Sequence, residues 1–184
     1  MATLSTSAWV LHDLGLAAGF GGPLFGRLAL HRAVRDITDD AQRGKVLSDA
    51  WRRYNVVTIG SLGIAAVTWL LGRALISGRS IDRETRSLVR TKDILLGATI
   101  LTGAASLLSG ERLRREGPGG AVPIEQGNVP SGRTPLEAAR MQRFLRVIGP
   151  LNIALTAGVI GITTVLAMKS GKSHKWSLVS RLLP

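Results

Sequence analysis

The sequence predicts an all-α, polytopic membrane protein in which four transmembrane helices form a bundle. The hydrophobic residues, 45% of the 184, are gathered into long uncharged blocks, and the charged residues lie between these blocks. Glycine is frequent, with 22 residues, whereas aromatic residues make up only 4%. Small residues let helices approach closely in lipid, where packing rather than hydrophobicity holds them together. We therefore expect one integral, multi-pass membrane domain over residues 1–184.

The apolar blocks set the expected spans at residues 7–30, 54–72, 93–110 and 146–168. A hydrocarbon core of about 30 Å requires roughly 20 helical residues. The second and fourth blocks meet this length directly, and the third is at the lower limit. The first meets it only if His12 and Asp13 lie near a membrane interface. Pro23 and Pro150 fall inside spans, and each is expected to kink its helix by removing a backbone hydrogen bond.

Two connections carry helix-start signals. Thr38, followed by Asp39 and Asp40, predicts the N-cap of a short amphipathic connecting helix that runs into the second span, since acids suit the first turn of a helix. Ser80 is expected to cap the third helix in the same way.

The remaining polar segments are predicted to be irregular or interfacial. Residues 116–133 are rich in Gly and Pro and predict a mobile surface loop without regular structure. The following Thr134-Pro135-Leu136-Glu137 matches a capping box with proline at the first helical position, and predicts the start of the last helix. Residues 173–184 mix basic and apolar side chains and predict an interfacial tail.

The charge of the chain indicates a lipid partner. The net charge is +12, and the basic residues flank the apolar blocks. At these positions, the interaction with anionic headgroups stabilises each basic side chain by about 1 kcal/mol. We expect a bilayer with anionic headgroups, bound lipid and no nucleic acid. The two sides of the four-span arrangement carry 14 and 10 basic residues, which leans towards both termini being outside.

The sharpest pattern is a glycine seam in the first span, formed by Gly15, Gly19, Gly22 and Gly26. At 100° per residue these four positions fall within an arc of about 60° on one helix face. Such a seam lets another helix approach closely. That helix belongs either to the same chain or, in a homodimer or larger membrane complex, to a partner.

Polar residues are expected to cluster at both ends of the bundle. At one end, His12 and Asp13 are predicted to approach Arg90, Lys92 or Asp93, because the starts of the first and third spans share a side. At the other end, Arg27, Asn55, Arg146 and Asn152 are expected to form a second cluster. We interpret the first cluster mainly as a structural clamp that holds the helices together, and a proton or cation entry site is the alternative.

Three stretches resemble a family of small four-span membrane proteins of unknown function, which includes the relatives of transmembrane protein 205. They are LHDLGLAAGFGGPLFGRLAL, DDAQRGKVLSDAWRRYNVV and AARMQRFLRVIGPLNIALTAGVIG, about a third of the chain. The family often has a histidine at the head of its last span, where this chain has Phe144 and Leu145. The resemblance implies a membrane protein, with a link to drug or metal tolerance.

No catalytic set is evident from the sequence. Serines have no suitable histidine nearby, and phosphate loops and metal-ligand clusters are absent. We therefore expect a non-enzymatic bundle that acts as an accessory or assembly subunit in a membrane complex. The alternatives are a small transporter or channel that uses the His12 cluster, and a pigment- or haem-binding protein with His12 as ligand. Apart from these alternatives, neither a cofactor nor a metal is predicted.

Overall fold

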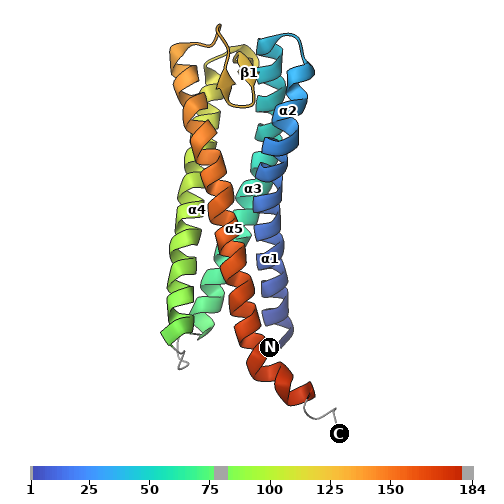
Figure 1. The fold of residues 1–184 in the computed structure, drawn as a ribbon, viewed down its shortest axis with the longest axis vertical. Helices are drawn as coiled ribbons and strands as arrows, with labels where there is room; N and C mark the ends of the chain where they lie inside the picture. The colour runs from blue at the N-terminus through green and yellow to red at the C-terminus, as the bar shows by residue number, and fades with distance from the viewer. Residues whose placement is uncertain (1, 77–82, 180–184) are drawn as a thin grey trace.

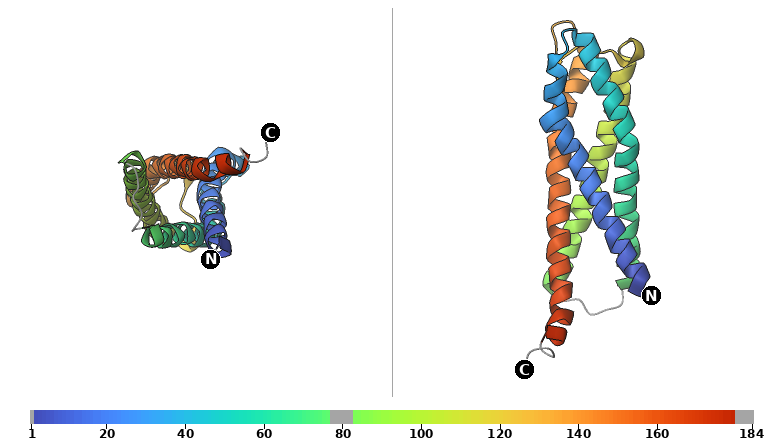
Figure 2. Two further views of the ribbon diagram at one scale, coloured as in Figure 1. Left: turned by 90° about the horizontal axis from the view of Figure 1, so that it is seen from below. Right: turned by 90° about the vertical axis from the view of Figure 1, so that its right-hand side faces the viewer.

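A computed structural model describes the backbone of residues 2–76 and 83–179, and the side chains of residues 7–72 and 83–169. Its main elements are four long helices, α1 (Ala2–Phe25), α3 (Asp40–Ile76), α4 (Arg83–Arg115) and α5 (Leu136–Val179). They run alternately up and down, side by side (Figure 1), and seen along the bundle the tilted helices form the four sides of a square (Figure 2). α1 packs mainly on α3, and α4 mainly on α5. The predicted helical bundle is confirmed.

The first helix changes its hydrogen-bonding pattern shortly after Pro23. A π-helical turn, η1 (Gly26–Leu30), is followed by α2 (His31–Ala33) and a 3-10 turn, η2 (Val34–Asp36). In the π turn, the His31 N–H reaches the carbonyl oxygen of Gly26, five residues back. Such wide turns inside α-helices are often found at functional sites. This segment places α2 beside the upper end of α3 (Figure 1).

Within the described residues, α3, α4 and α5 each contain a stretch long and apolar enough to cross a membrane. α1 does not reach that hydropathy, because His12, Asp13, Pro23 and its glycines dilute its apolar residues. The structure therefore supports three of the four predicted spans. All four helices turn large apolar side chains outward, in the manner expected of a surface covered by lipid: Leu14, Val56, Leu101 and Val147 are 61%, 73%, 72% and 68% exposed.

The segment over the upper end of the bundle contains regular structure, so the prediction of an irregular loop at 116–133 was wrong in this respect. A 3-10 turn, η3 (Pro118–Gly120), precedes an antiparallel hairpin of β1 (Ile124–Gln126) and β2 (Val129–Pro130). Gly127, with φ of +51°, makes the tight turn. Apart from the turn, burial stabilises the hairpin, since Ile124 is 3% exposed and packs with Val34 and Leu47.

Arg43 and Gly44 attach this hairpin to α3. The Arg43 guanidinium donates hydrogen bonds to the carbonyl oxygens of Ile37, Thr38, Ile124 and Glu125. At Gly44, a Cβ atom would lie 1.7 Å from the Val122 carbonyl oxygen. Only glycine lets the two backbones come this close. These contacts turn a Gly- and Pro-rich sequence into a packed lid on the bundle.

The helix starts differ from the sequence predictions in their caps. α3 is capped by Asp39, whose carboxylate accepts a hydrogen bond from the Gln42 N–H, and not by Thr38. α5 begins at Leu136, one residue after the predicted first position Pro135, and the Thr134 hydroxyl donates to the Pro123 carbonyl oxygen and accepts from the Ser131 N–H. It therefore secures the preceding loop.

Two further predictions concern the ends of the described chain. Ser80 lies outside the described residues. The predicted interfacial tail begins within α5, which continues without a break to Val179, and residues 180–184 also lie outside the described part. The connecting helix predicted before the second span is the first part of α3, in one uninterrupted helix of 37 residues.

Candidate functional site

The glycine seam is filled by α3 of the same chain. A Cβ atom at Gly15 would lie 2.5 Å from the Ser61 carbonyl oxygen, and one at Gly19 would lie 3.2 Å from Leu62. Further up, Gly22 and Gly26 make room for the rings of Tyr54 and Trp51. The Tyr54 hydroxyl also donates to the Ala18 carbonyl oxygen over 2.6 Å. In this structure the seam joins two helices within the chain.

A buried lysine and histidine meet near the lower end of the bundle. Lys92 of α4 is 0% exposed and His12 of α1 is 3% exposed, and Lys92 Nζ lies 2.8 Å from His12 Nε2. His12 Nδ1 lies 2.8 Å from the Ala65 carbonyl oxygen. A carbonyl can only accept, so Nδ1 carries the hydrogen and Nε2 accepts one from Lys92.

Trp69 completes this cluster. The Lys92 ammonium lies 3.8 Å from the centroid of the Trp69 ring, a cation–π contact, and the His12 ring stacks on the same indole. The Trp69 Nε1–H donates to an Asp93 carboxylate oxygen over 2.8 Å. The result is a compact set of side chains from three helices in which each polar atom described here has a partner.

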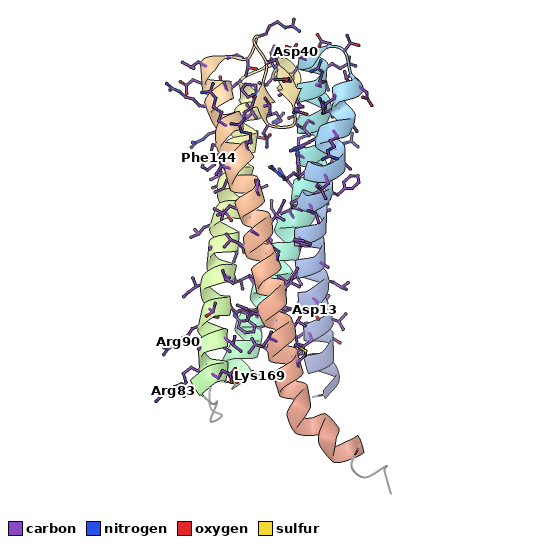
Figure 3. The ribbon with its side chains drawn as sticks, viewed as in Figure 1. Asp13, Asp40, Arg83, Arg90, Phe144 and Lys169 are labelled. Carbon is purple, nitrogen blue, oxygen red and sulfur yellow. The ribbon has the colours of Figure 1, made fainter. Side chains whose placement is uncertain are left out.

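Of the other residues predicted near His12, Asp13 and Arg90 are exposed. Figure 3 shows Arg90 on the outer side of α4. Both nitrogens of His12 are engaged, so an axial bond from His12 to a haem or pigment would require Lys92 or the Ala65 carbonyl to be displaced. The geometry therefore gives little support to the pigment-binding alternative.

An apolar layer lies directly above the Lys92–His12 pair. It consists of one buried side chain from each helix: Leu16, Ala65, Leu96 and Val159. Leu16 and Leu96 stand one helical turn above His12 and Lys92. Within the described residues, this layer lies between the pair and the buried polar residues of the upper half. A channel would require this layer to open.

A cavity of about 200 Å³ occupies the bundle above this layer. A single water requires only about 10–15 Å³ of such space. Leu107 and Leu145 contribute to its apolar wall, and Val122 and Ile124 of the hairpin segment form its roof. Polar side chains line it as well: Ser48, Arg52, Asn55, Thr58, Ser106, Glu111, Arg114, Asn128, Gln142 and Asn152. Such a mixture suits a molecule with both apolar and polar parts.

Gln142 and Asn152 of α5 are among the residues that line this cavity. Asn152 Nδ2 donates to the Thr99 carbonyl oxygen over 2.8 Å and to the Thr102 hydroxyl over 2.7 Å. Gln142 is 0% exposed, and its Nε2 donates to the Pro123 carbonyl oxygen over 3.3 Å. Its Oε1 is buried and has no hydrogen-bond partner within the described chain. A buried acceptor left unpaired costs about 1–3 kcal/mol and so requires an explanation.

The second predicted cluster divides between two pockets. Asn55 and Asn152 line the cavity, whereas Arg27 and Arg146 line a neighbouring pocket next to the hairpin. Gly127 and Asn128, at the hairpin turn, border both. Where the sequence suggested one cluster, the structure has these residues in two adjoining pockets.

Comparisons with protein-family models, with curated proteins and with solved structures found no match. The resemblance to the four-span family remains a prediction.

Sequence reasoning missed Gln142 and Trp69. For Gln142 there was a signal, because Gly149, Asn152, Thr156 and Thr163 mark the inner face of α5. Two helical turns back from Gly149, the same face reaches Gln142. For Trp69 there was none, since tryptophans are also frequent where a span meets water.

Proposed function

We propose that this protein is a non-enzymatic, multi-pass membrane protein that holds an amphiphilic small molecule in the cavity below the hairpin. In this proposal α1 crosses the bilayer together with α3, α4 and α5. The observation that carries it is Gln142, a fully buried amide that lines this mixed apolar and polar cavity and whose Oε1 has no partner within the described chain. A ligand hydroxyl or amide N–H at this point would satisfy the oxygen.

The position of the cavity supports an amphiphile over a water-soluble ligand. Along α4 its lining residues run from Gly103 to Arg114, about 17 Å at 1.5 Å per residue. Gly103 lies in the apolar part of α4, whereas Glu111 and Arg114 lie in its polar last turns. A ligand along this path would place its apolar part towards the bilayer centre and its polar part near the hairpin.

The assembly role expected from the sequence loses its main argument, because α3 occupies the glycine seam. Transport is the second candidate. A cavity above a closed apolar layer, with a buried Lys92–His12 pair below it, is an arrangement from which transport could operate if the layer opened. Flux of a bound ligand across liposomes would be required to support that step.

Photo-crosslinking tests the binding proposal. The protein, in lipid nanodiscs, is treated with a photoactivatable fatty acid, and the labelled residues are mapped by peptide mass spectrometry. Label is expected on cavity residues of α4, such as Ser106 and Leu107. Gly149→Leu should reduce it about fivefold or more, because Gly149 lines the cavity and a Cβ there meets no atom within 4 Å.

Gly161→Leu is the matched control. Gly161 lies on the same helix, is exposed, and also has free space around its Cβ position. This variant should label as the parent does. Equal labelling of parent and Gly149→Leu, or label found only on outward residues such as Leu101, would contradict the proposal.

A further inference from the structure

Three arginines surround the second pocket, which has a volume of about 280 Å³ and lies beside the hairpin. Arg27 comes from the π turn η1, Arg32 from α2 and Arg146 from α5. The remaining lining residues are Leu28, His31, Gln126, Gly127, Asn128 and Val129. None of these is acidic, so the arginine charges meet no carboxylate in the pocket wall.

Other arginines at the hairpin end of the bundle are paired with carboxylates. Arg114 pairs with Glu111, Arg133 with Asp39 and Asp40, and Arg140 with Glu137. In the described part of the chain, Arg27, Arg32 and Arg146 form no ion pair with a carboxylate within 4.0 Å, and their guanidinium groups make no hydrogen bond. Three unpaired guanidinium groups around one pocket repel one another, and an anion between them would remove that repulsion.

The π turn accounts for two of the three arginines. In a regular α-helix, residues five apart differ by about 140° around the axis and point to different sides. In a π turn, hydrogen bonds join residues five apart, and such residues come close to alignment. Arg27 and Arg32 are five apart across this turn, and both line the pocket. The irregularity in the helix thus brings a second arginine into the lining of the same pocket.

His31 supplies a further polar atom in the same wall. Its Nε2 is buried and has no hydrogen-bond partner within the described residues. On the other side of the ring, Gly127 approaches so closely that a Cβ there would lie 2.6 Å from Nδ1. The ring is thus held against the hairpin turn, and its Nε2 keeps an unused hydrogen-bonding capacity beside the pocket.

From these observations we propose that Arg27, Arg32 and Arg146 form a binding site for a phosphate group. Guanidinium groups bind phosphate oxygens through paired, charge-assisted hydrogen bonds, which makes arginine the fitting residue type. The phosphate belongs either to a lipid headgroup or to free phosphate. Phe25 and Leu28, 65% and 54% exposed on the adjoining helix surface, favour the lipid, because its acyl chains would lie against them.

Isothermal titration of the protein in a neutral detergent tests this site. Three additions are compared: short-chain phosphatidic acid, diacylglycerol of the same chain length, and inorganic phosphate. Phosphatidic acid is expected to bind and diacylglycerol is not. Inorganic phosphate that binds as tightly would identify free phosphate as the ligand, whereas much weaker binding would identify the lipid; both results support a phosphate site.

Charge-removing variants show whether the pocket itself is responsible. Arg27→Gln and Arg146→Gln should each weaken binding about tenfold or more, as expected for loss of a charged hydrogen bond. Arg143→Gln is the matched control, because Arg143 is exposed on the same helix as Arg146 and lies outside the pocket. An equal loss in the control, or binding of diacylglycerol as tight as that of phosphatidic acid, overturns the proposal. All three arginines are exposed, so the variants should fold, which circular dichroism checks.

Discussion

Lys92 Nζ lies 2.8 Å from Nε2 of His12, and at most 3% of either residue is exposed. A buried ammonium is costly unless it is paired. Here the imidazole of a neighbouring helix accepts a hydrogen bond from the ammonium, the Trp69 ring centroid lies 3.8 Å away, and the Ala65 carbonyl orients the imidazole from its far side. The Lys92 ammonium of α4 therefore contacts both α1, through His12, and α3, through Trp69.

This arrangement predicts that removing the acceptor is worse than removing the charge. His12→Ala leaves the Lys92 ammonium buried with no imidazole and should lower the free energy of unfolding by about 3–5 kcal/mol. Lys92→Met keeps the volume, discards the charge and should cost less than about 2 kcal/mol. Denaturation in detergent, followed by circular dichroism, measures both. Equal losses in the two variants would contradict the assignment of the hydrogen bond.

The glycine seam gives a sharper contrast between neighbouring positions. Gly15→Ala would place its Cβ 2.5 Å from the Ser61 carbonyl oxygen, a backbone atom that cannot move aside. We expect a loss of about 1–3 kcal/mol in stability, as for other overpacked positions. At Gly21 no atom lies within 4 Å, so Gly21→Ala should be neutral or gain up to about 1 kcal/mol from helix propensity. A seam that served only a partner chain would leave monomer stability unchanged in both.

Features that depend on local sequence patterns could be predicted in this structure, whereas features that depend on long-range contacts could not. The apolar stretches of α3, α4 and α5 follow from the uncharged blocks, whereas the sequence placed His12 near a membrane interface and did not indicate that it is only 3% exposed. The hairpin could not be found, because its stability comes from Ile124 and Val122 packing against α3, which are long-range contacts. The cap of α3 moved by one residue, from Thr38 to Asp39, since both residue types fit the local pattern.

The packing of the hairpin on α3 predicts protection from proteases. Gly44→Ala would force a methyl group against the Val122 carbonyl oxygen and should detach the segment between α4 and α5. Limited proteolysis by trypsin should then cut at Arg133 at least about tenfold faster than in the parent. Gly60→Ala, on the same helix with free space around it, is the control and should digest as the parent does. Unchanged cleavage in Gly44→Ala would mean that the segment is not held in this way.

His31 predicts a loss of stability in mild acid. Burial first, and the nearby Arg27 second, lower the pKa of His31 from 6.5 to about 4. As the pH falls from 6.5 towards 4, the unfolded chain takes up a proton that the folded chain does not, so unfolding becomes easier. The full shift corresponds to about 3 kcal/mol, and partial exposure reduces it to about 1–2 kcal/mol. Stability above pH 6.5 should not depend on this group.

The comparison with His31→Gln isolates this contribution from that of other titrating groups. Between pH 6.5 and 5, where most carboxylates stay ionised, the variant should lose less stability than the parent. Thermal unfolding at a series of pH values measures the difference. Parallel curves for the two proteins in this window would rule out His31 as the source.

Gln142 predicts opposite effects on stability and on binding. Its Oε1 is buried without a partner in the described chain, so Gln142→Leu removes an unpaired acceptor at little change in volume. The empty protein should gain up to about 1 kcal/mol in the free energy of unfolding, after allowance for the weak hydrogen bond of 3.3 Å that Nε2 gives to Pro123. That carbonyl keeps its bond from Thr134, so the loop should not loosen. An amphiphile that uses Oε1 should bind about tenfold more weakly to the same variant. Melting temperature without ligand and fatty-acid crosslinking yield are measured side by side. A variant that is both less stable and equally well labelled would show that Gln142 serves the fold and not the ligand.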